Sequence, residues 1–298
     1  LVARHENEIG ETTNVSELPQ FADRKTTKVI DGVSLTGWFT EDFHLNELNQ
    51  LKARERIPQI RPNNVQYNDL YNIPTLEQII ELADQHYQKT GKIIGLYIET
   101  KHPTYFQQQN LALENSLLMS LAKHKYTREI APVYLQSFEI SNLKAMREQL
   151  AQLNSIKQIK IIQLYGGKST QPADAAMQKL PINYGDMATV AGLKEVAKYA
   201  DGVGPSKTYI LPNTQAATVT SFVKDAHAVG LKVHPYTLRP ENEFLPDYLD
   251  CGVNPAERCE SGAIKEYELF FRAGVDGIFT DDPGLGRKAL LNYQASLK

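Results

Sequence analysis

The sequence predicts an α/β fold built on a parallel sheet, either a barrel or an open doubly wound sheet. From residue 75 onward, short apolar runs alternate with helical patterns, and this is the order of elements that βα units produce. The 298 residues, 42% of them apolar, are enough for one large α/β domain or two small ones. We therefore expect successive strands to lie parallel, with helices packed against them.

Six apolar runs are the expected strands of this sheet. The two runs that are short and contain glycine are assigned from their place in the alternation more than from β propensity. In parallel α/β folds the reacting groups gather at the C-terminal ends of the strands, so polar residues that end these runs are candidates for a site. The runs are residues 92–99, 133–138, 159–165, 201–205, 232–238 and 275–281.

Helix start and stop signals lie between these runs. Thr75 and Gln78 form a T-x-x-Q capping box, which predicts a helix that begins at this point. Ser141 is expected to cap a second helix, and a third helix with an apolar face from Val219 onward is expected to end at Gly230.

The first 74 residues have a different character, because they are polar and rich in threonine and turn residues. A stretch of this length is either an insertion over one mouth of the domain or disordered. Trp38, Phe39 and Phe43 favour a packed insertion, since disordered segments contain few aromatic residues. We expect one short helix in it, from His44.

Composition excludes some classes of partner. With 32 basic and 35 acidic residues, the net charge of -3 offers no excess to hold a polyanion, so no nucleic-acid partner is expected. No apolar run approaches the roughly 20 residues of a membrane span, and no signal peptide opens the sequence. Cys251 and Cys259 are spaced for a small disulfide-closed loop in an oxidising compartment, with two free thiols as the alternative.

Three charged side chains are the candidates for chemistry. Glu99 and Lys101 stand two positions apart on an expected strand, so both point to the same face, where they could bind a hard cation and an anionic group. A plain ion pair is the alternative. His5 ends an apolar triplet and could act as general acid or base, with His102 and His234 as further candidates.

These residues lie in segments that resemble the glycerophosphodiester phosphodiesterase family. LVARHENEIGETTNV resembles the family's strand that ends in a His-Asp pair before a Thr-Thr turn, and GLYIETKHP resembles its Glu-x-Lys strand. VYLQSF resembles its Ser-Phe strand, and HPYTLR and GVDGIFTDDP resemble its last two strands. The segments follow the family's order, and the likeness covers essentially the whole chain.

The resemblance implies a fold and an activity. The fold would be a (β/α)8 TIM barrel of the phosphodiesterase type, with about residues 6–74 as a family-specific insertion over the barrel mouth. The reaction would be the metal-dependent hydrolysis of a small glycerophosphodiester to glycerol 3-phosphate and an alcohol, with Ca2+ or Mg2+ as the cation. The likeness is to the larger, often periplasmic or secreted members.

Carried over by position, the resemblance also implies roles for single residues. His5 matches the second of two catalytic histidines, Glu99 the third metal-binding carboxylate, and Lys101 the lysine beside the phosphate. Tyr236 is expected to line the substrate groove, and Phe138 is a further substrate-binding candidate. The chain departs from the family at residue 6, where a glutamate replaces the usual aspartate after the histidine.

A larger departure is the absence of two family motifs, the His-Arg-Gly strand and the Glu-x-Asp strand. We therefore expect residues 1–298 to form one barrel domain that lacks roughly the first two strands and first helix, and the chain to be a fragment of the enzyme. Two other classes remain open. One is a non-catalytic scaffold or binding protein, and the other is a glycoside hydrolase with Glu99 and Asp281 as its carboxylate pair.

Overall fold

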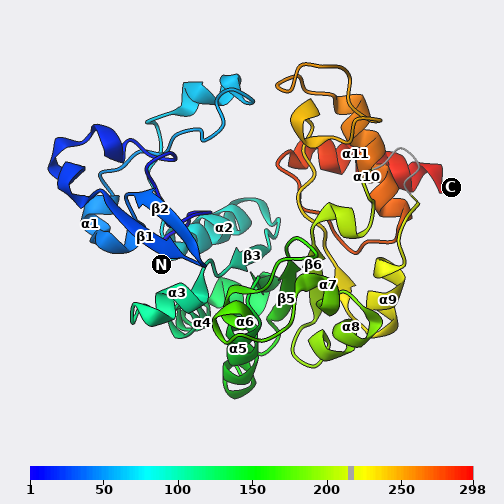
Figure 1. Ribbon diagram of the computed structural model, residues 1–298, viewed down its shortest axis with the longest axis horizontal. Helices are drawn as coiled ribbons and strands as arrows, with labels where there is room; N and C mark the ends of the chain where they lie inside the picture. Colours follow the sequence, from blue (N-terminus) through cyan, green and yellow to red (C-terminus); the bar gives the residue numbers. More distant parts are fainter. Residues whose placement is uncertain (214–217, 298) are drawn as a thin grey trace. The chain divides into compact units, whose positions relative to one another are not determined.

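The computed structural model describes residues 1–213 and 218–297, and these residues form two compact units. The first unit is Leu1–Ile159 and the second is Lys160–Lys298, coloured blue to green and green to red in Figure 1. In the described part of the chain, no helix has both the length and the apolar character needed to cross a bilayer.

The first unit contains a small antiparallel sheet, a parallel strand pair and five α-helices among its described residues. Its strands are β1 (Thr26–Ile30), β2 (Val33–Gly37), β3 (Leu96–Glu99) and β4 (Val133–Ser137). Its α-helices are α1 (Leu45–Leu48), α2 (Leu76–Thr90), α3 (Pro103–Gln108), α4 (Glu114–Lys123) and α5 (Ile140–Gln152). Short 3-10 or π turns are η1 (Val15–Glu17), η2 (Pro19–Arg24), η3 (Thr40–Asp42), η4 (Pro62–Tyr67) and η5 (Tyr126–Ile130).

The first 74 residues pack around a core of their own. Trp38, Phe39 and Phe43 are buried, as their aromatic character predicts, and the short helix expected from His44 is α1. The main cluster of this segment consists of Ile9, Val15, Phe21, Trp38, Phe43, Leu48, Leu51 and Ile73. These apolar contacts hold the segment in place without a long helix.

The hairpin of β1 and β2 was not expected from the helical periodicity of the sequence. Its strands pair from Thr26↔Gly37 to Ile30↔Val33, so Asp31 and Gly32 form a two-residue turn. Both turn residues have positive φ, 50° and 82°, and this is the geometry that favours Asp-Gly in tight hairpins. The turn therefore has a local cause in the sequence, an Asp-Gly pair between two β-branched runs.

The predicted capping box is confirmed. The Gln78 backbone N–H donates to Thr75 Oγ1 at 3.2 Å, and the Thr75 N–H donates to Gln78 Oε1 at 2.9 Å, so α2 begins at Leu76. The prediction that Ser141 caps the next helix is wrong. Helix α5 begins one residue earlier, at Ile140, and Ser141 lies in its first turn.

Strands β3 and β4 are parallel, with Leu96 opposite Val133 and Glu99 opposite Gln136. A hydrogen bond ties the end of β3 to α5, because the Thr100 hydroxyl donates to Asn142 Oδ1 at 2.6 Å. Buried polar groups are costly unless they are hydrogen-bonded, and this contact satisfies two of them.

The second unit continues the alternation of strands and helices. Its strands are β5 (Lys160–Tyr165), β6 (Gly202–Pro205) and β7 (Lys232–Val233), which pair in parallel. Its α-helices are α6 (Ala173–Met177), α7 (Tyr184–Met187), α8 (Val190–Val196), α9 (Phe222–Ala228), α10 (Glu260–Arg272) and α11 (Pro283–Ser296), with 3-10 turns η6 (Lys207–Tyr209) and η7 (Asn242–Phe244). Cys251 and Cys259 form a disulfide, as one of the two alternatives from the sequence had it.

Two expectations for this unit need correction. The run 275–281 is not a regular strand, although the Leu238 N–H donates to the Phe279 carbonyl and Leu238 forms an isolated parallel bridge with Thr280. Strand β7 itself spans only two residues, although the backbone N–H groups of His234 and Tyr236 still donate to the carbonyls of Val203 and Pro205 in β6. Val219 lies outside α9 and is exposed, because the helix begins at Phe222.

Neighbouring residues of α4 test the packing of the first unit. Leu118 is fully buried, whereas the side chain of Met119 is 52% exposed. Leu118→Ala should lower the free energy of unfolding by about 2–5 kcal/mol, because it leaves a cavity. Met119→Ala is the matched control and should change it by less than about 0.5 kcal/mol in the same chemical denaturation experiment. Equal effects of the two substitutions would contradict the packing described here.

Candidate active site at the end of strand β3

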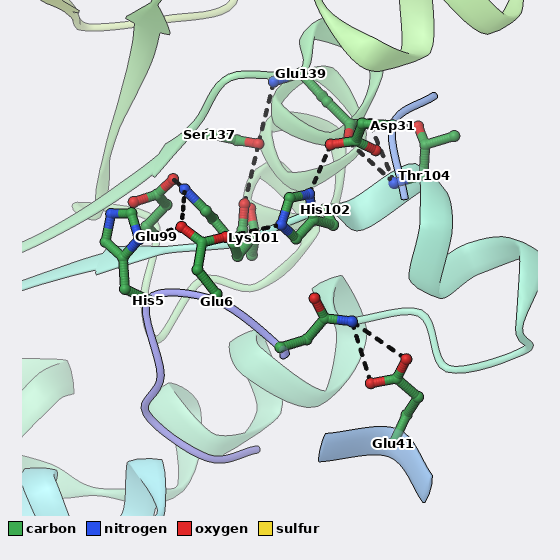
Figure 2. Close-up of polar contacts among 12 residues, drawn as sticks. His5, Glu6, Asp31, Glu41, Glu99, Lys101, His102, Thr104, Ser137 and Glu139 are labelled. Atoms are coloured by element: carbon green, nitrogen blue, oxygen red, sulfur yellow. Dashed lines mark hydrogen bonds and ion pairs between the residues drawn. The ribbon is translucent and has the colours of Figure 1, made fainter. Parts of the chain in front are cut away.

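The candidate site lies where β3 ends. Glu99 is the last residue of the strand, and Lys101 follows it with Nζ 3.5 Å from Glu99 Oε1. Figure 2 shows these two side chains beside His5, Glu6 and His102. The prediction that Glu99 and Lys101 point to the same side is therefore confirmed.

Glu6 connects the predicted residues to one another. Its Oε1 lies 2.5 Å from His5 Nδ1 and 3.8 Å from Lys101 Nζ, while its Oε2 lies 3.3 Å from His102 Nε2 (Figure 2). Burial disfavours a charge on this carboxyl group, but the hydrogen bonds with His102 and His5 and the charge of Lys101 outweigh burial. The pKa of Glu6 is thereby held well below its usual value, so Glu6 is a carboxylate at neutral pH.

His102 uses both ring nitrogens. Its Nδ1 is 2.6 Å from Asp31 Oδ2, and its Nε2 faces Glu6. A ring that contacts two carboxylates in this way is a double donor, which is the imidazolium form. Burial opposes the charge, but the hydrogen bonds to Asp31 and Glu6 outweigh it and raise the pKa of His102 to about 9.

His5 is the most exposed member of the group, with 70% of its side chain accessible. Glu6 is the hydrogen-bond partner found for its ring among the described residues. A proton on Nδ1 can be donated to Glu6, which leaves Nε2 to exchange a proton with a bound molecule.

Phe138 and Lys101 are also brought together. The Lys101 ammonium lies over the Phe138 ring, 5.5 Å from its centre, and Phe138 directly follows β4. An aromatic face within about 6 Å of an ammonium attracts it. Phe138 thus restrains Lys101, and its role in binding a substrate stays a prediction.

The described residues supply only part of a cation site. Glu99 Oε1 is buried and has no hydrogen bond, its contact with Lys101 being a 3.5 Å ion pair, so this oxygen is suited to a positively charged ligand. Within residues 1–213 and 218–297, however, no group of three or more His, Cys, Asp or Glu side chains is arranged to hold a metal ion. Hard divalent cations take about six to eight oxygen ligands, so Glu99 does not make such a site alone.

Other sequence candidates lie in the second unit. Tyr236 follows β7, and its hydroxyl donates to the Tyr165 carbonyl at 2.7 Å, so this contact fixes the ring. Asp281 pairs with Arg239 at 2.7 Å, and burial lowers the pKa of His234. The substrate-binding role of Tyr236 stays a prediction.

Sequence reasoning missed Asp31 and left His102 as one of several candidate histidines. Asp31 was not considered, although the Asp-Gly turn signal could have indicated a hairpin tip with an exposed carboxylate. His102 was one histidine among several near strand ends, and nothing in a single sequence links it with a residue 71 positions away.

The chain is similar to known proteins over nearly its whole length. Residues 1–285 match the glycerophosphoryl diester phosphodiesterase family. The chain is 30% identical over 311 residues to a glycerophosphodiester phosphodiesterase of Arabidopsis thaliana, covering 99% of this chain and 74% of the relative. It is 29% identical over 302 residues to a glycerophosphodiester phosphodiesterase of Haemophilus influenzae, covering 96% of this chain and 77% of the relative.

A solved structure supports the fold. The crystal structure of a glycerophosphoryl diester phosphodiesterase from Silicibacter pomeroyi DSS-3 aligns with a TM-score of 0.60 and 16% identity, covering 98% of this chain and 78% of that one. At this identity the likeness concerns the fold alone. The predicted α/β fold of the phosphodiesterase TIM barrels is confirmed, and the absence of particular barrel strands stays a prediction.

The charge of His102 can be measured directly. In histidine-labelled protein, NMR titration of the His102 ring should give a midpoint near the pKa of about 9. Asp31→Asn should lower this pKa because it removes a negative partner. A midpoint close to the ordinary value of 6.5 in the unsubstituted protein would contradict the double contact.

The same contact should make stability depend on pH. The pKa of His102 is higher in the folded state than its ordinary value, so its contribution is complete below about pH 6.5 and is lost as pH rises through about 9. His102→Gln should therefore lower the free energy of unfolding by on the order of 1–3 kcal/mol at about pH 6, and by less at about pH 10. Urea unfolding at the two pH values measures this difference.

Proposed function

Because this chain belongs to the glycerophosphoryl diester phosphodiesterase family, we propose that it hydrolyses glycerophosphodiesters, with a divalent cation, to glycerol 3-phosphate and an alcohol. The observation that carries the proposal is the continuous set of contacts from His5 through Glu6 and Lys101 to Glu99 (Figure 2). This set contains a general acid–base group, a cation for an anionic substrate and a carboxylate with an open oxygen.

Each of these side chains would have a separate role in phosphodiester cleavage. Lys101 would hold a phosphoryl oxygen and stabilise the negative charge that develops there. His5 would exchange a proton with the attacking or leaving oxygen through Nε2, while Glu6 holds Nδ1. Phe138 would keep the Lys101 ammonium directed toward the phosphate.

The proposed cation is Ca2+ or Mg2+, and Glu99 is the residue of this chain that would hold it. A bound divalent cation would neutralise phosphoryl charge and lower the pKa of a hydroxyl group or water. Among the described residues, no group of three or more His, Cys, Asp or Glu side chains is arranged to complete the cation's ligands. We therefore infer that the active enzyme also contains the His-Arg-Gly and Glu-x-Asp strands that are absent from this sequence.

A periplasmic or secreted location is part of the same proposal. The bond between Cys251 and Cys259 supports it, because structural disulfides persist mainly in oxidising compartments. Tyr236 is proposed to line the groove for the alcohol portion of the substrate.

Release of glycerol 3-phosphate from glycerophosphocholine tests the activity. Lys101→Met should lower kcat by about 10²–10³-fold, because it removes a charge aimed at the transition state. His5→Ala should lower kcat by about 10²–10⁴-fold through loss of proton transfer. Lys125→Met is the control, since the Lys125 side chain is 71% exposed and precedes the N-terminal end of β4, whereas the site lies at the strand's other end, and it should leave kcat unchanged.

Two further comparisons test the need for a cation and for the absent strands. The assay is run with Ca2+, with Mg2+ and with a chelator, on this chain and on a form extended upstream through the absent strands. Activity that needs a cation and the extension would support each part of the proposal. An extended form that is folded and metal-loaded, yet inactive on a panel of glycerophosphodiesters, would reject it in favour of a non-catalytic barrel.

A further inference from the structure

We propose that Asp31 and His102 are positioning residues for the reaction, and that they act by holding the Glu6 carboxylate between His5 and Lys101. This inference rests on the proposed function for its kinetic consequences. Glu6 divides its oxygens, because Oε2 faces His102 whereas Oε1 faces His5 and Lys101. Fixing one oxygen therefore fixes the direction of the other.

His102 is itself held rigidly. It has φ of 51° and ψ of 45°, in the left-handed region, immediately before the first turn of α3. That turn is fixed from the other side, because the Thr104 N–H donates to the buried Glu139 carboxylate at 3.1 Å. A non-glycine residue in this conformation is uncommon, and here the surrounding contacts keep it there.

Asp31 is held at the hairpin tip by packing. Ile30, the residue before it, is buried in a cluster with Phe39 and Tyr105, and Tyr105 belongs to α3. This cluster joins the end of β1 to the helix that follows His102. The contact between Asp31 Oδ2 and His102 Nδ1, at 2.6 Å, is therefore supported by apolar contacts on both sides.

The charges around His102 allow its ring to hold two carboxylates in place. Asp31 and Glu6 are the acidic groups that face the ring, and Lys101 is the basic group close enough to repel it. A doubly protonated ring between two carboxylates restrains both of them, because each contact is charge-assisted. The exposed His5 ring has Glu6 as its support, so loosening Glu6 would loosen His5.

Kinetics of three variants, made in the form extended upstream through the absent strands, test this coupling. Asp31→Asn and His102→Gln should each lower kcat by about tenfold and leave KM within about twofold, because they misplace a reacting group. Asn tolerates the left-handed turn, so Asp31→Asn should not disturb the backbone. Asp42→Asn is the matched control, since Asp42 has a similar exposed fraction, 31% against 30%, and pairs with Lys28 instead.

A double-substitution cycle tests whether His102 acts through Glu6. In a Glu6→Gln background, His102→Gln should cause no further loss of kcat, because the group through which it acts has been changed. Additive losses, or a kcat for Asp31→Asn and His102→Gln equal to that of Asp42→Asn, would overturn the proposal. Thermal unfolding of each variant separates these effects from a general loss of stability.

A second readout does not depend on activity. The His5 ring resonances, assigned by their disappearance in His5→Gln, should shift in Asp31→Asn and His102→Gln but not in Asp42→Asn. Unchanged His5 resonances would overturn the positioning role. If the extended, metal-loaded form hydrolyses no glycerophosphodiester while these shifts occur, the positioning of His5 stands and only the proposed function fails.

Discussion

The ionised carboxylate of Glu6 is the group on which the candidate site depends, because its two oxygens meet basic side chains from separate segments. His5 is its sequence neighbour, whereas Lys101 and His102 come from the end of β3, more than ninety positions away. A half-buried carboxylate is stable in its charged form only when such partners surround it. The N-terminal segment and the strand end are thus joined by electrostatic contacts at the point where the chemistry is proposed.

The apolar contacts of the first unit support this arrangement at a distance. The cluster of Ile30, Phe39 and Tyr105 ties the hairpin to α3, and Glu139 fixes the start of that helix. These contacts are buried, so they resist small displacements more strongly than exposed ion pairs do. The site is consequently a rigid group of side chains whose most accessible member, His5, faces the solvent.

Much of the fold could be predicted from the sequence, because buried parallel strands leave apolar runs and helices leave caps. Runs 92–99 and 133–138 contain β3 and β4, and the Thr75 box marks the start of α2. The hairpin was missed because most of its side chains, including Val29 and Val33, are exposed and show no core-facing alternation. In the site, the i, i+2 spacing of Glu99 and Lys101 predicted their contact, although the strand ends at Glu99 and Lys101 lies just beyond it. The contact of Asp31 with His102 depends on tertiary packing, which no local pattern encodes.

The two-residue turn of the hairpin has an evolutionary consequence. Asp31 owes its positive φ to a turn of two residues, so one inserted residue would replace this turn geometry and redirect the Asp31 side chain. Insertions of that kind would be neutral in an ordinary surface hairpin, where length drifts freely. Here they would separate the acidic tip from residue 102. Among related chains, a two-residue turn and a histidine at position 102 should therefore occur together or be absent together.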